Sequence, residues 1–312
     1  MTKTSLICGS LAFDKIMQFE GRFADTLLAD QLHKVNVSFL VPTLRTEFGG
    51  CSGNIAYNLK MLGGEPLIMG VMGQDNAPYL ERLQALGIST KNILIKSAAY
   101  TAQCFVTADV DNNQINAFHP GAMSFAHENH VADAGPVALA IISPDGHEGM
   151  LKHAQDCHDQ GIPFLFDPGQ QMPMFSGAQL TNFITQATYV TCNDYEIELL
   201  IERTGLTLED IASRVEALIV TRGEQGSEIY VDGKRIDIPA VPAKAVLDPT
   251  GCGDAYRAGL LFGLTNDLDW ETTGRLASLM GAIKIAHQGA QNHQLTATEI
   301  GDLFEAAFGY RY

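Results

Sequence analysis

The sequence has 312 residues, 46% of them hydrophobic, and carries a formal net charge of −16. A chain of this length can bury a large core in one α/β domain or in two smaller domains. The acidic balance argues against nucleic acid or an anionic membrane surface as the main partner, because polyphosphate binding needs a positive surface. A nucleotide ligand is still compatible with it, since a few backbone N–H groups and one metal ion neutralise a phosphate chain locally.

The cysteines and the apolar stretches indicate a cytoplasmic protein. The cysteines form no CxxC pair and occur singly, as free thiols do in a reducing compartment. They are Cys8, Cys51, Cys104, Cys157, Cys192 and Cys252. The apolar run at residues 6–8 is too short for a signal peptide, and no stretch approaches the roughly 20 apolar residues of a membrane helix.

Strand-like runs alternate with helix-like patterns through most of the chain. We predict buried strands at residues 67–72, 138–143, 163–167, 189–192 and 218–221. We predict helices at residues 53–62, 147–160, 196–204 and 254–264. This alternation implies an α/β fold, with a mostly parallel central sheet flanked by helices on both faces. Ligand loops would then follow the carboxyl ends of the strands.

Two segments, residues 13–48 and 101–118, alternate like strands without a strong helix between them. The sequence DNN at residues 111–113 predicts a hairpin turn inside the second segment. We interpret these lid segments as a small β-sheet lid on a single domain that spans residues 1–312. In the alternative interpretation they are edge strands of the main sheet.

The segment at residues 248–259, with the sequence DPTGCGDAYRAG, carries the chemistry. Its glycines allow a tight turn into an apolar helix, whose first N–H groups point outward and attract anions. Asp254 lies in the first helical turn, where a carboxylate can take a proton from an attacking hydroxyl while N–H groups stabilise a moving phosphoryl group. In isolation, such an aspartate more often caps the helix.

The whole segment resembles the second signature of the ribokinase-like, or PfkB, carbohydrate kinase family, with Cys252 at a position where alanine is common. The resemblance implies a ribokinase-like fold, with ATP and Mg²⁺ as cofactors. It implies that Asp254 is the catalytic base and that the N–H groups of Gly251, Cys252 and Gly253 form an anion hole.

The resemblance also allows a K⁺ ion near Asp248 and Thr250, where it would order the anion hole. The sequence by itself gives little support for that ion.

A second motif, FGGCSGNIA at residues 48–56, precedes a predicted helix. Gly49 and Gly50 let the backbone approach a sugar, and the Asn54 amide both donates to and accepts from hydroxyls. Taken alone, the motif could equally be a closely packed helix start, but beside the first motif it resembles the sugar-binding signature of the family. Asp14 follows the first strand and matches a sugar-binding aspartate; alone it could be an ordinary turn residue.

Three weaker matches predict which residues bind ATP. Asn193 and Glu196 resemble the family's N-x-x-E motif, in which the glutamate positions Mg²⁺ through water, although the same pair could form a capping box. Thr221, Gly223 and Gly226 resemble its T-x-G-x-x-G turn, which could also be a simple hairpin.

The region of Gly289 and Gln291 completes the expected ATP site. Arg222 and Arg257 are candidates for phosphate contacts, or are ordinary surface cations.

The resemblance covers residues 5–291 and is closest to the bacterial adenosine kinase branch. The strings that carry it lie at residues 19–23, 32–35, 38–41, 109–111, 120–124 and 167–171. In that branch a lid phenylalanine stacks on the purine, and Phe118 matches it. Positions that contact the nucleoside match Ser10, Ser38, Gln170 and Gln171. The second lid aromatic of the branch is replaced by Cys104, with Phe105 beside it.

We therefore predict an adenosine kinase that transfers the γ-phosphoryl group of ATP to the ribose 5′-hydroxyl to form AMP. The alternatives are a ribokinase-like kinase acting on a free furanose sugar or another purine nucleoside, and a catalytically silent nucleoside-binding protein. An exposed edge of the lid further suggests a homodimer.

Overall fold

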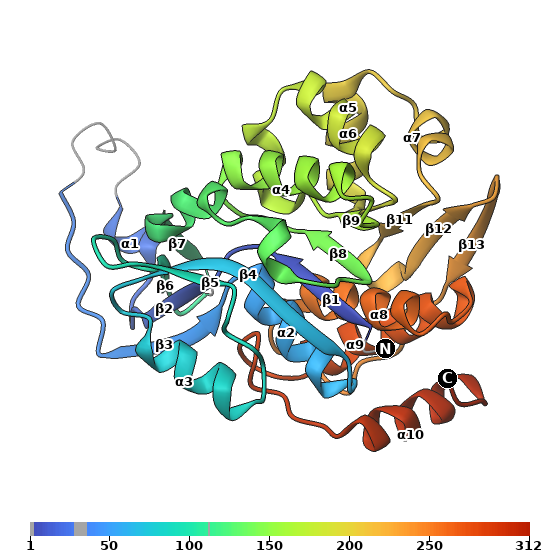
Figure 1. The fold of residues 1–312 in the computed structure, drawn as a ribbon. Helices are drawn as coiled ribbons and strands as arrows, with labels where there is room; N and C mark the ends of the chain where they lie inside the picture. The colour runs from blue at the N-terminus through green and yellow to red at the C-terminus, as the bar shows by residue number, and fades with distance from the viewer. Residues whose placement is uncertain (1–2, 28–35, 112) are drawn as a thin grey trace.

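The computed structural model describes residues 3–27, 36–111 and 113–312, which form two β-sheets with surrounding helices (Figure 1). The larger sheet consists of β1 (Thr4–Cys8), β4 (Glu65–Gly73), β5 (Ile93–Lys96), β8 (Leu139–Ile142), β9 (Phe164–Phe166), β10 (Tyr189–Asn193), β11 (Ala217–Thr221), β12 (Ser227–Val231) and β13 (Lys234–Ile238). Their spatial order is β13-β12-β11-β10-β9-β8-β1-β4-β5. All pairs from β11 to β5 are parallel, and β12 and β13 add an antiparallel hairpin.

The α-helices of the described residues are α1 (Phe23–Thr26), α2 (Cys51–Met61), α3 (Ala77–Ala85), α4 (His147–Asp159), α5 (Gly177–Gln186), α6 (Asp194–Thr204), α7 (Leu208–Arg214), α8 (Cys252–Thr265), α9 (Trp270–Ile285) and α10 (Ala297–Phe308). Short 3₁₀ segments are η2 (Gly121–Glu128), η3 (Val131–Ala134), η4 (Gly169–Met174) and η5 (Gly223–Gln225). No helix in this described part of the chain is both long and apolar enough to span a membrane.

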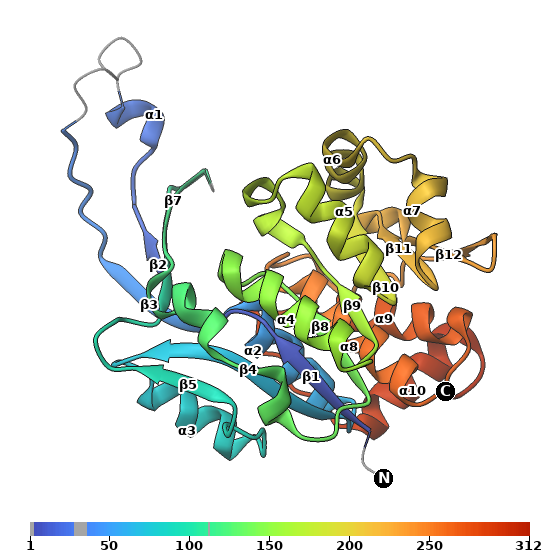
Figure 2. The same ribbon diagram turned by 45° about the horizontal axis from the view of Figure 1, so that its top comes forward.

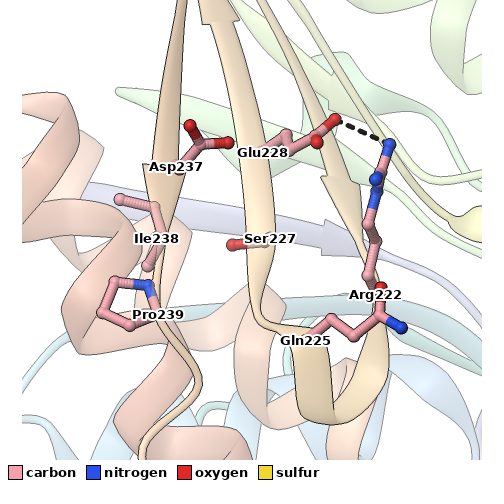
Figure 3. Close-up of a pocket in the computed structure, with 7 residues that line it drawn as sticks. All are labelled: Arg222, Gln225, Ser227, Glu228, Asp237, Ile238 and Pro239. Carbon is pink, nitrogen blue, oxygen red and sulfur yellow. Dashed lines mark ion pairs between the residues drawn. The ribbon is translucent and has the colours of Figure 1, made fainter.

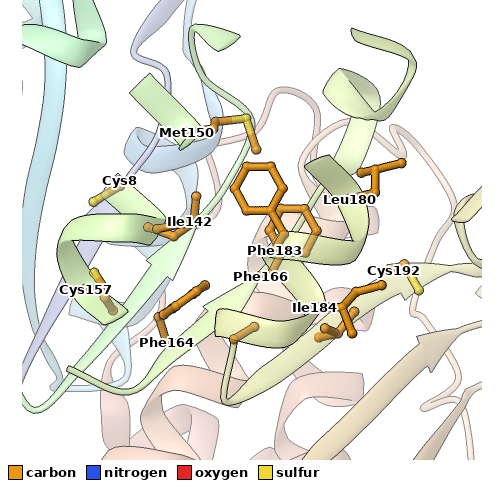
Figure 4. Packing of buried hydrophobic residues seen from close by; sticks show 14 of the residues in the cluster. Cys8, Ile142, Met150, Cys157, Phe164, Phe166, Leu180, Phe183, Ile184 and Cys192 are labelled. Carbon is orange, nitrogen blue, oxygen red and sulfur yellow. The ribbon is translucent and has the colours of Figure 1, made fainter. Parts of the chain in front are cut away.

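The sheet has a hydrophobic core on each face, because successive strand residues point to opposite sides. Leu6 and Cys8 of β1 face α4, α5 and α6, whereas Ile7 between them faces α2, α8 and α9 (Figure 1). Figure 4 shows the first of these cores, in which the rings of Phe166 and Phe183 stack with centroids 4.3 Å apart. The predicted parallel sheet with helices on both faces is confirmed.

The strands and helices predicted from the sequence all form, with bounds that differ by a few residues. Sequence reasoning did not assign α3, α5, α7, α9 and α10. Capping boxes at Ser176 and Thr207 fix the starts of α5 and α7, and Thr296 does the same for α10.

The lid segments form a separate four-stranded sheet, so the alternative of edge strands is wrong. Its strands are β2 (Ala12–Gln18), β3 (Thr43–Gly49), β6 (Ala102–Ala108) and β7 (Gln114–His119), in the order β3-β2-β6-β7. β2 and β6 are parallel, whereas the other two pairs are antiparallel, which confirms the predicted hairpin between β6 and β7. This sheet lies at the opposite end of the molecule from β12 and β13 (Figure 2). Its role as the lid of a single domain stays a prediction.

Helices α8 and α9 pack closely at Gly259, and we expect Gly259→Ala to destabilise the fold. A Cβ atom at Gly259 would lie 2.5 Å from the Ala277 Cα, so backbone would have to move. Such overpacking typically costs about 2 kcal/mol of the free energy of unfolding, which urea denaturation measures.

The matched control is Gly281→Ala in α9, where the nearest atom to a new Cβ is the Cys252 carbonyl oxygen at 3.8 Å. This variant should be neutral or gain up to about 1 kcal/mol from helix propensity. Equal stability of the two variants would contradict the packing account.

Candidate active site

The predicted ligand segments gather at one edge of the larger sheet. Parallel strands end at the same edge, and ligands of α/β proteins bind outside their carboxyl ends. Ser10 follows β1, Asp167 follows β9, and Asn193 and Thr221 end β10 and β11. The start of α8 joins them there, because Asp254 is hydrogen-bonded to α2.

The turn before α8 has the conformation that its glycines predict. Gly251 is the N-cap residue, with φ 79° and ψ 5°, and a Cβ atom there would lie 2.8 Å from the Ala290 Cβ. The N–H group of Cys252 donates to the Pro249 carbonyl at 3.1 Å. No hydrogen bond among the described residues uses the N–H groups of Gly251 and Gly253. Of the predicted anion-hole donors, these two are therefore available, whereas that of Cys252 is already engaged.

Asp254 is bound to the second predicted motif. Its Oδ2 atom accepts a hydrogen bond from Asn54 Nδ2 at 2.8 Å, and both side chains are largely withdrawn from water. Burial raises the pKa of Asp254 to about 6, against the opposing effect of the Asn54 hydrogen bond. At neutral pH the group is mostly a carboxylate but is more basic than an ordinary aspartate, which suits a general base.

A buried network orients the Asn54 amide. Gln291 Nε2 donates to Asn54 Oδ1 at 2.9 Å and to the Tyr79 hydroxyl at 2.8 Å, and Tyr79 donates to the Gly49 carbonyl at 2.7 Å. Because the carbonyl side of Asn54 is an acceptor, its NH₂ group faces Asp254. Gln291 was predicted at the ATP site, but the residue is 2% exposed and instead contacts Asn54 of the second motif, residues 48–56, which we call the sugar motif. Sequence reasoning missed Tyr79, for which no motif gave a signal.

Asp14 belongs to a row of side chains that crosses the four-stranded sheet. Asp14 is paired with Glu47 of β3 and with Cys104 of β6, and Cys104 is paired with Phe118 of β7. Directly paired residues on adjacent strands point to the same face. The predicted sugar ligand Asp14 and the predicted base platform Phe118 therefore share one face, with Cys104 between them.

Two features of Asp14 are compatible with its predicted role as a sugar ligand. Burial, together with repulsion from Glu47 and Asp248, raises the pKa of Asp14 to about 6. A Cβ atom at Gly49 would lie 2.5 Å from Asp14 Oδ2, so glycine leaves the space that this carboxylate occupies.

Ser10 holds the sugar motif against β1. Its Oγ accepts the Cys51 N–H at 3.2 Å at the start of α2, and its carbonyl accepts the Ser52 N–H at 3.0 Å. Gly50 has φ 87°, and a Cβ atom there would lie 2.5 Å from the Ser10 carbonyl. Gln170 lies beside this motif, with Nε2 4.0 Å from Cys51 Sγ.

The remaining predicted substrate contacts are less closely connected. Gln171 is half-buried in η4 next to Gln170, and Ser38 is exposed in the irregular segment before β3. No hydrogen bond within the described ranges joins Ser38 to the rest of the site. The string at residues 32–35 lies outside the described residues.

Arg257 is not a surface cation. It is buried and holds Asp167 in two hydrogen bonds, from Nε at 3.0 Å and from Nη2 at 2.9 Å. Its Nη1 also approaches the Gly253 carbonyl at 3.5 Å. Such a planar, two-point pair fixes geometry more than a lysine would. Asp167 follows a buried parallel strand, which is the signal that could have identified this partner.

Asn193 and Glu196 form the capping box that was the alternative interpretation. Glu196 Oε2 accepts the Asn193 N–H at 2.8 Å, and Asn193 Oδ1 accepts the Glu196 N–H at 2.7 Å. Burial raises the pKa of Glu196. The second carboxylate oxygen fits a water of hydrated Mg²⁺, which often binds through one carboxylate and the substrate phosphates. The described residues contain no cluster of three or more side chains able to hold a metal directly.

The turn at Thr221 adjoins a pocket on the β12–β13 hairpin (Figure 3). Gly226 has φ 89°, and a Cβ atom there would meet the Ile238 carbonyl at 2.1 Å, so the turn requires glycine. Gly223 also has a positive φ, 53°. Arg222 pairs with Glu228 at 2.8 Å, inside a pocket that Asp237 also lines. Two carboxylates make this pocket a poor anion site, and Arg222 is already paired there.

The pocket is about 260 Å³ in volume. Its lining residues are Arg222, Gln225, Ser227, Glu228, Asp237, Ile238 and Pro239.

The surroundings of Asp248 do not fit a K⁺ ion. Its Oδ1 accepts the Thr250 N–H at 2.9 Å and its Oδ2 accepts the Gly289 N–H at 2.8 Å. These hydrogen bonds outweigh burial and lower the pKa of Asp248. Its carbonyl oxygen accepts from the Lys284 ammonium at 2.6 Å. The two carboxylate oxygens and the carbonyl oxygen of Asp248 therefore all face donors, one of which is itself a cation.

The model of the pfkB family carbohydrate kinases matches residues 19–297 of this chain. The chain belongs to the PfkB family. It is thus a phosphotransferase that uses a hydroxyl group as acceptor.

Solved and curated relatives agree with this assignment. The nucleoside kinase of Burkholderia thailandensis in complex with inosine has a TM-score of 0.90 and 54% identity, covering 98% of this chain and 99% of that chain. The nucleoside kinase of Methanocaldococcus jannaschii is 31% identical over 86% of this chain and 89% of its own length. The ribokinase of Thermotoga maritima, with a TM-score of 0.81 and 19% identity over 98% of this chain and 100% of that chain, confirms the ribokinase-like fold.

We expect the turnover number of this PfkB-family kinase to follow the ionisation of Asp254. A general base acts when deprotonated, so kcat should be constant above pH 7 and fall about tenfold per pH unit below the Asp254 pKa. In Asn54→Ala, loss of the donor to the charged carboxylate should move the midpoint of this fall to higher pH.

Asp14→Asn is the control, because Asp14 also has a pKa of about 6. At saturating acceptor, this variant should keep the wild-type midpoint. A midpoint that disappears in Asp14→Asn but is unmoved in Asn54→Ala would assign the ionisation to Asp14 instead.

Proposed function

We propose that this chain is an ATP-dependent nucleoside kinase that phosphorylates the ribose 5′-hydroxyl of a purine nucleoside. The observation that carries the proposal is the 2.8 Å hydrogen bond between Asn54 and Asp254. It brings the predicted sugar-binding amide and a basic carboxylate together beside the N–H groups of Gly251 and Gly253, which have no hydrogen-bond partner among the described residues. A hydroxyl held by the first group would lie next to the base and the anion hole that phosphoryl transfer requires.

The ribose in this proposal lies between α2 and the four-stranded sheet. The Asp14 carboxylate accepts hydrogen bonds from the vicinal hydroxyls, and Gly49 and Gly50 let the backbone come close. The base lies along the row from Asp14 to Phe118, a residue that is 53% exposed, so that its ring is accessible for stacking. A free sugar would leave this ring without a partner, which favours a nucleoside over a furanose.

ATP lies along the loops after β10 and β11 in this proposal, near Asn193, Thr221, Gly223 and Gly226, with Gly289 on its other side. Mg²⁺ would be held by the phosphates and, through water, by Glu196, and it would reduce the charge repulsion that opposes attack. The 5′-oxygen forms a bond to the γ-phosphorus as its proton passes to Asp254, and the bond to ADP breaks. The N–H groups of Gly251 and Gly253 stabilise the transferring group.

Closure of the lid segments over the acceptor would exclude water and limit hydrolysis of ATP. Asn292 Nδ2 donates to Glu47 Oε2 at 2.8 Å. This hydrogen bond joins β3 of the lid to the loop of Gly289, which lies beside ATP in the proposal, and is suited to such a closure.

Adenosine and inosine are the leading substrates. The sequence resemblance favours adenosine, and the Burkholderia thailandensis relative binds inosine and, in another structure, ADP with inosine. The replacement of the second lid aromatic by Cys104 removes one stacking partner, typically worth about 1 kcal/mol, and so weakens stacking on the purine. We therefore extend the proposal to purine nucleosides as a class.

A panel of adenosine, inosine, guanosine, ribose and fructose with labelled ATP tests the proposal. We expect labelled nucleoside monophosphates from the purine nucleosides and little product from the free sugars. Transfer to ribose or fructose alone would make the chain a sugar kinase. Nucleoside binding by calorimetry without transfer to any acceptor would favour a catalytically silent binding protein.

We also propose a homodimer through the lid. Leu44, Phe105 and Ile115 are 65%, 40% and 43% exposed and lie on the face of the four-stranded sheet opposite to Asp14. Exposed apolar faces of this kind often pair. Light scattering should give a mass of two chains, and Phe105→Glu should halve it; a single-chain mass for the wild type would contradict the dimer.

We keep the cytoplasmic location as part of the proposal. It is supported by the cysteines, all six of which are free in the structure.

A further inference from the structure

A fully buried lysine contacts the segment that leads into the turn at Gly251–Gly253, which we call the anion-hole turn. Lys284 occupies the last turn of α9 and is 0% exposed. Lysine is almost never buried without partners, because removing an ammonium group from water is costly. Burial lowers the pKa of Lys284, whereas Asp248 and Cys252 oppose this shift. The groups that surround Lys284 must therefore explain why this lysine is buried.

The Lys284 ammonium group joins two loops, the one before α8 and the one after α9, which lie beside the proposed ATP site. Lys284 Nζ donates to the Asp248 carbonyl at 2.6 Å and to the His287 carbonyl at 3.1 Å. The first carbonyl begins the turn that leads to Gly251, and the second lies in the loop that leads to Gly289. Coordination by backbone carbonyls from two loops is the environment that binds a bare monovalent cation such as K⁺ in proteins.

The Asp248 carboxylate ties the same two loops from the other side. It accepts one N–H group from Thr250 and one from Gly289, at 2.9 and 2.8 Å. The loops also touch directly, since a Cβ atom at Gly251 would lie 2.8 Å from the Ala290 Cβ. The position of the anion-hole turn therefore depends on this junction, and Lys284 is its positive centre.

We propose that the Lys284 ammonium takes the place of a bound monovalent cation, so that transfer by this enzyme does not depend on K⁺. The ammonium holds the carbonyls of Asp248 and His287 together and thereby sets the Gly251–Gly253 turn. A K⁺ ion bound to the same carbonyl would be a like charge in a buried site, so the two cations exclude each other. Lys284 is a positioning residue, because it acts through the turn and does not touch the substrates.

The test compares the wild type with two variants in buffers of tetramethylammonium, a cation too large for the site. Its activity arm rests on the proposed function. The wild type should have the same kcat with and without K⁺. Lys284→Ala leaves space for an ion: kcat should fall about 100-fold, as on loss of an oxyanion donor, and should recover partly when K⁺ or ammonium is added. Lys284→Met fills the space without a charge and should lose activity without recovery.

Lys91→Met is the matched control. Its ammonium also donates to a backbone carbonyl, that of Ala134 at 3.0 Å, but lies away from the site. This variant should keep the wild-type kcat and its indifference to K⁺. A wild-type enzyme that needs K⁺, or a folded Lys284→Ala variant that keeps full activity in tetramethylammonium, would overturn the proposal.

A second readout does not require catalysis. If K⁺ fills the space left by Lys284→Ala, it should raise the thermal unfolding temperature of that variant and leave the wild type unchanged. This separates the two proposals: a wild type inactive on every acceptor rejects the proposed function, whereas an equal effect of K⁺ on the two proteins rejects the role of Lys284.

Discussion

The hydrogen bond between Asn54 and Asp254 is the interaction on which the site depends. It joins side chains that are 200 positions apart in the chain, one from α2 and one from α8, and it does so beneath the ends of the parallel strands. Gln291 and Tyr79 leave the Asn54 amide one orientation, with its NH₂ group toward the carboxylate. The motif at residues 48–56 and the segment at residues 248–259 are therefore aligned by the same few atoms.

Burial then determines how these groups behave chemically. Asp14 and Asp254 are both partly buried, and burial raises the pKa of each to about 6. This chain is strongly acidic overall, yet the turn at Gly251 has N–H groups that no other described residue engages, and the Lys284 ammonium contacts the segment before that turn. In the proposed function, local donors rather than net charge create the place for a phosphoryl group. A protein with a formal charge of −16 would bind ATP in this way.

Much of the fold could be predicted from the sequence, because buried parallel strands are continuous apolar runs and their helices follow at regular spacing. The glycines at 50, 226 and 251 have the positive φ angles that their motifs required. The rest depended on tertiary contacts. The sequence does not distinguish a buried Arg257 from a surface cation, because its partner Asp167 lies 90 positions away in the chain. Lys284 and Tyr79 belong to no motif, and their roles follow only from the groups packed around them.

In the proposed mechanism Asp254 removes the proton of the acceptor hydroxyl, and a comparison of substrate binding and turnover in Asp254→Asn tests this role. The amide keeps the shape of the side chain and can still pair with Asn54, but it cannot accept a proton. Calorimetry with the best purine nucleoside should give an affinity close to the wild type, while the single-turnover rate should fall about 1,000-fold, as expected for loss of a general base. A rate close to that of the wild type would show that Asp254 is not the general base.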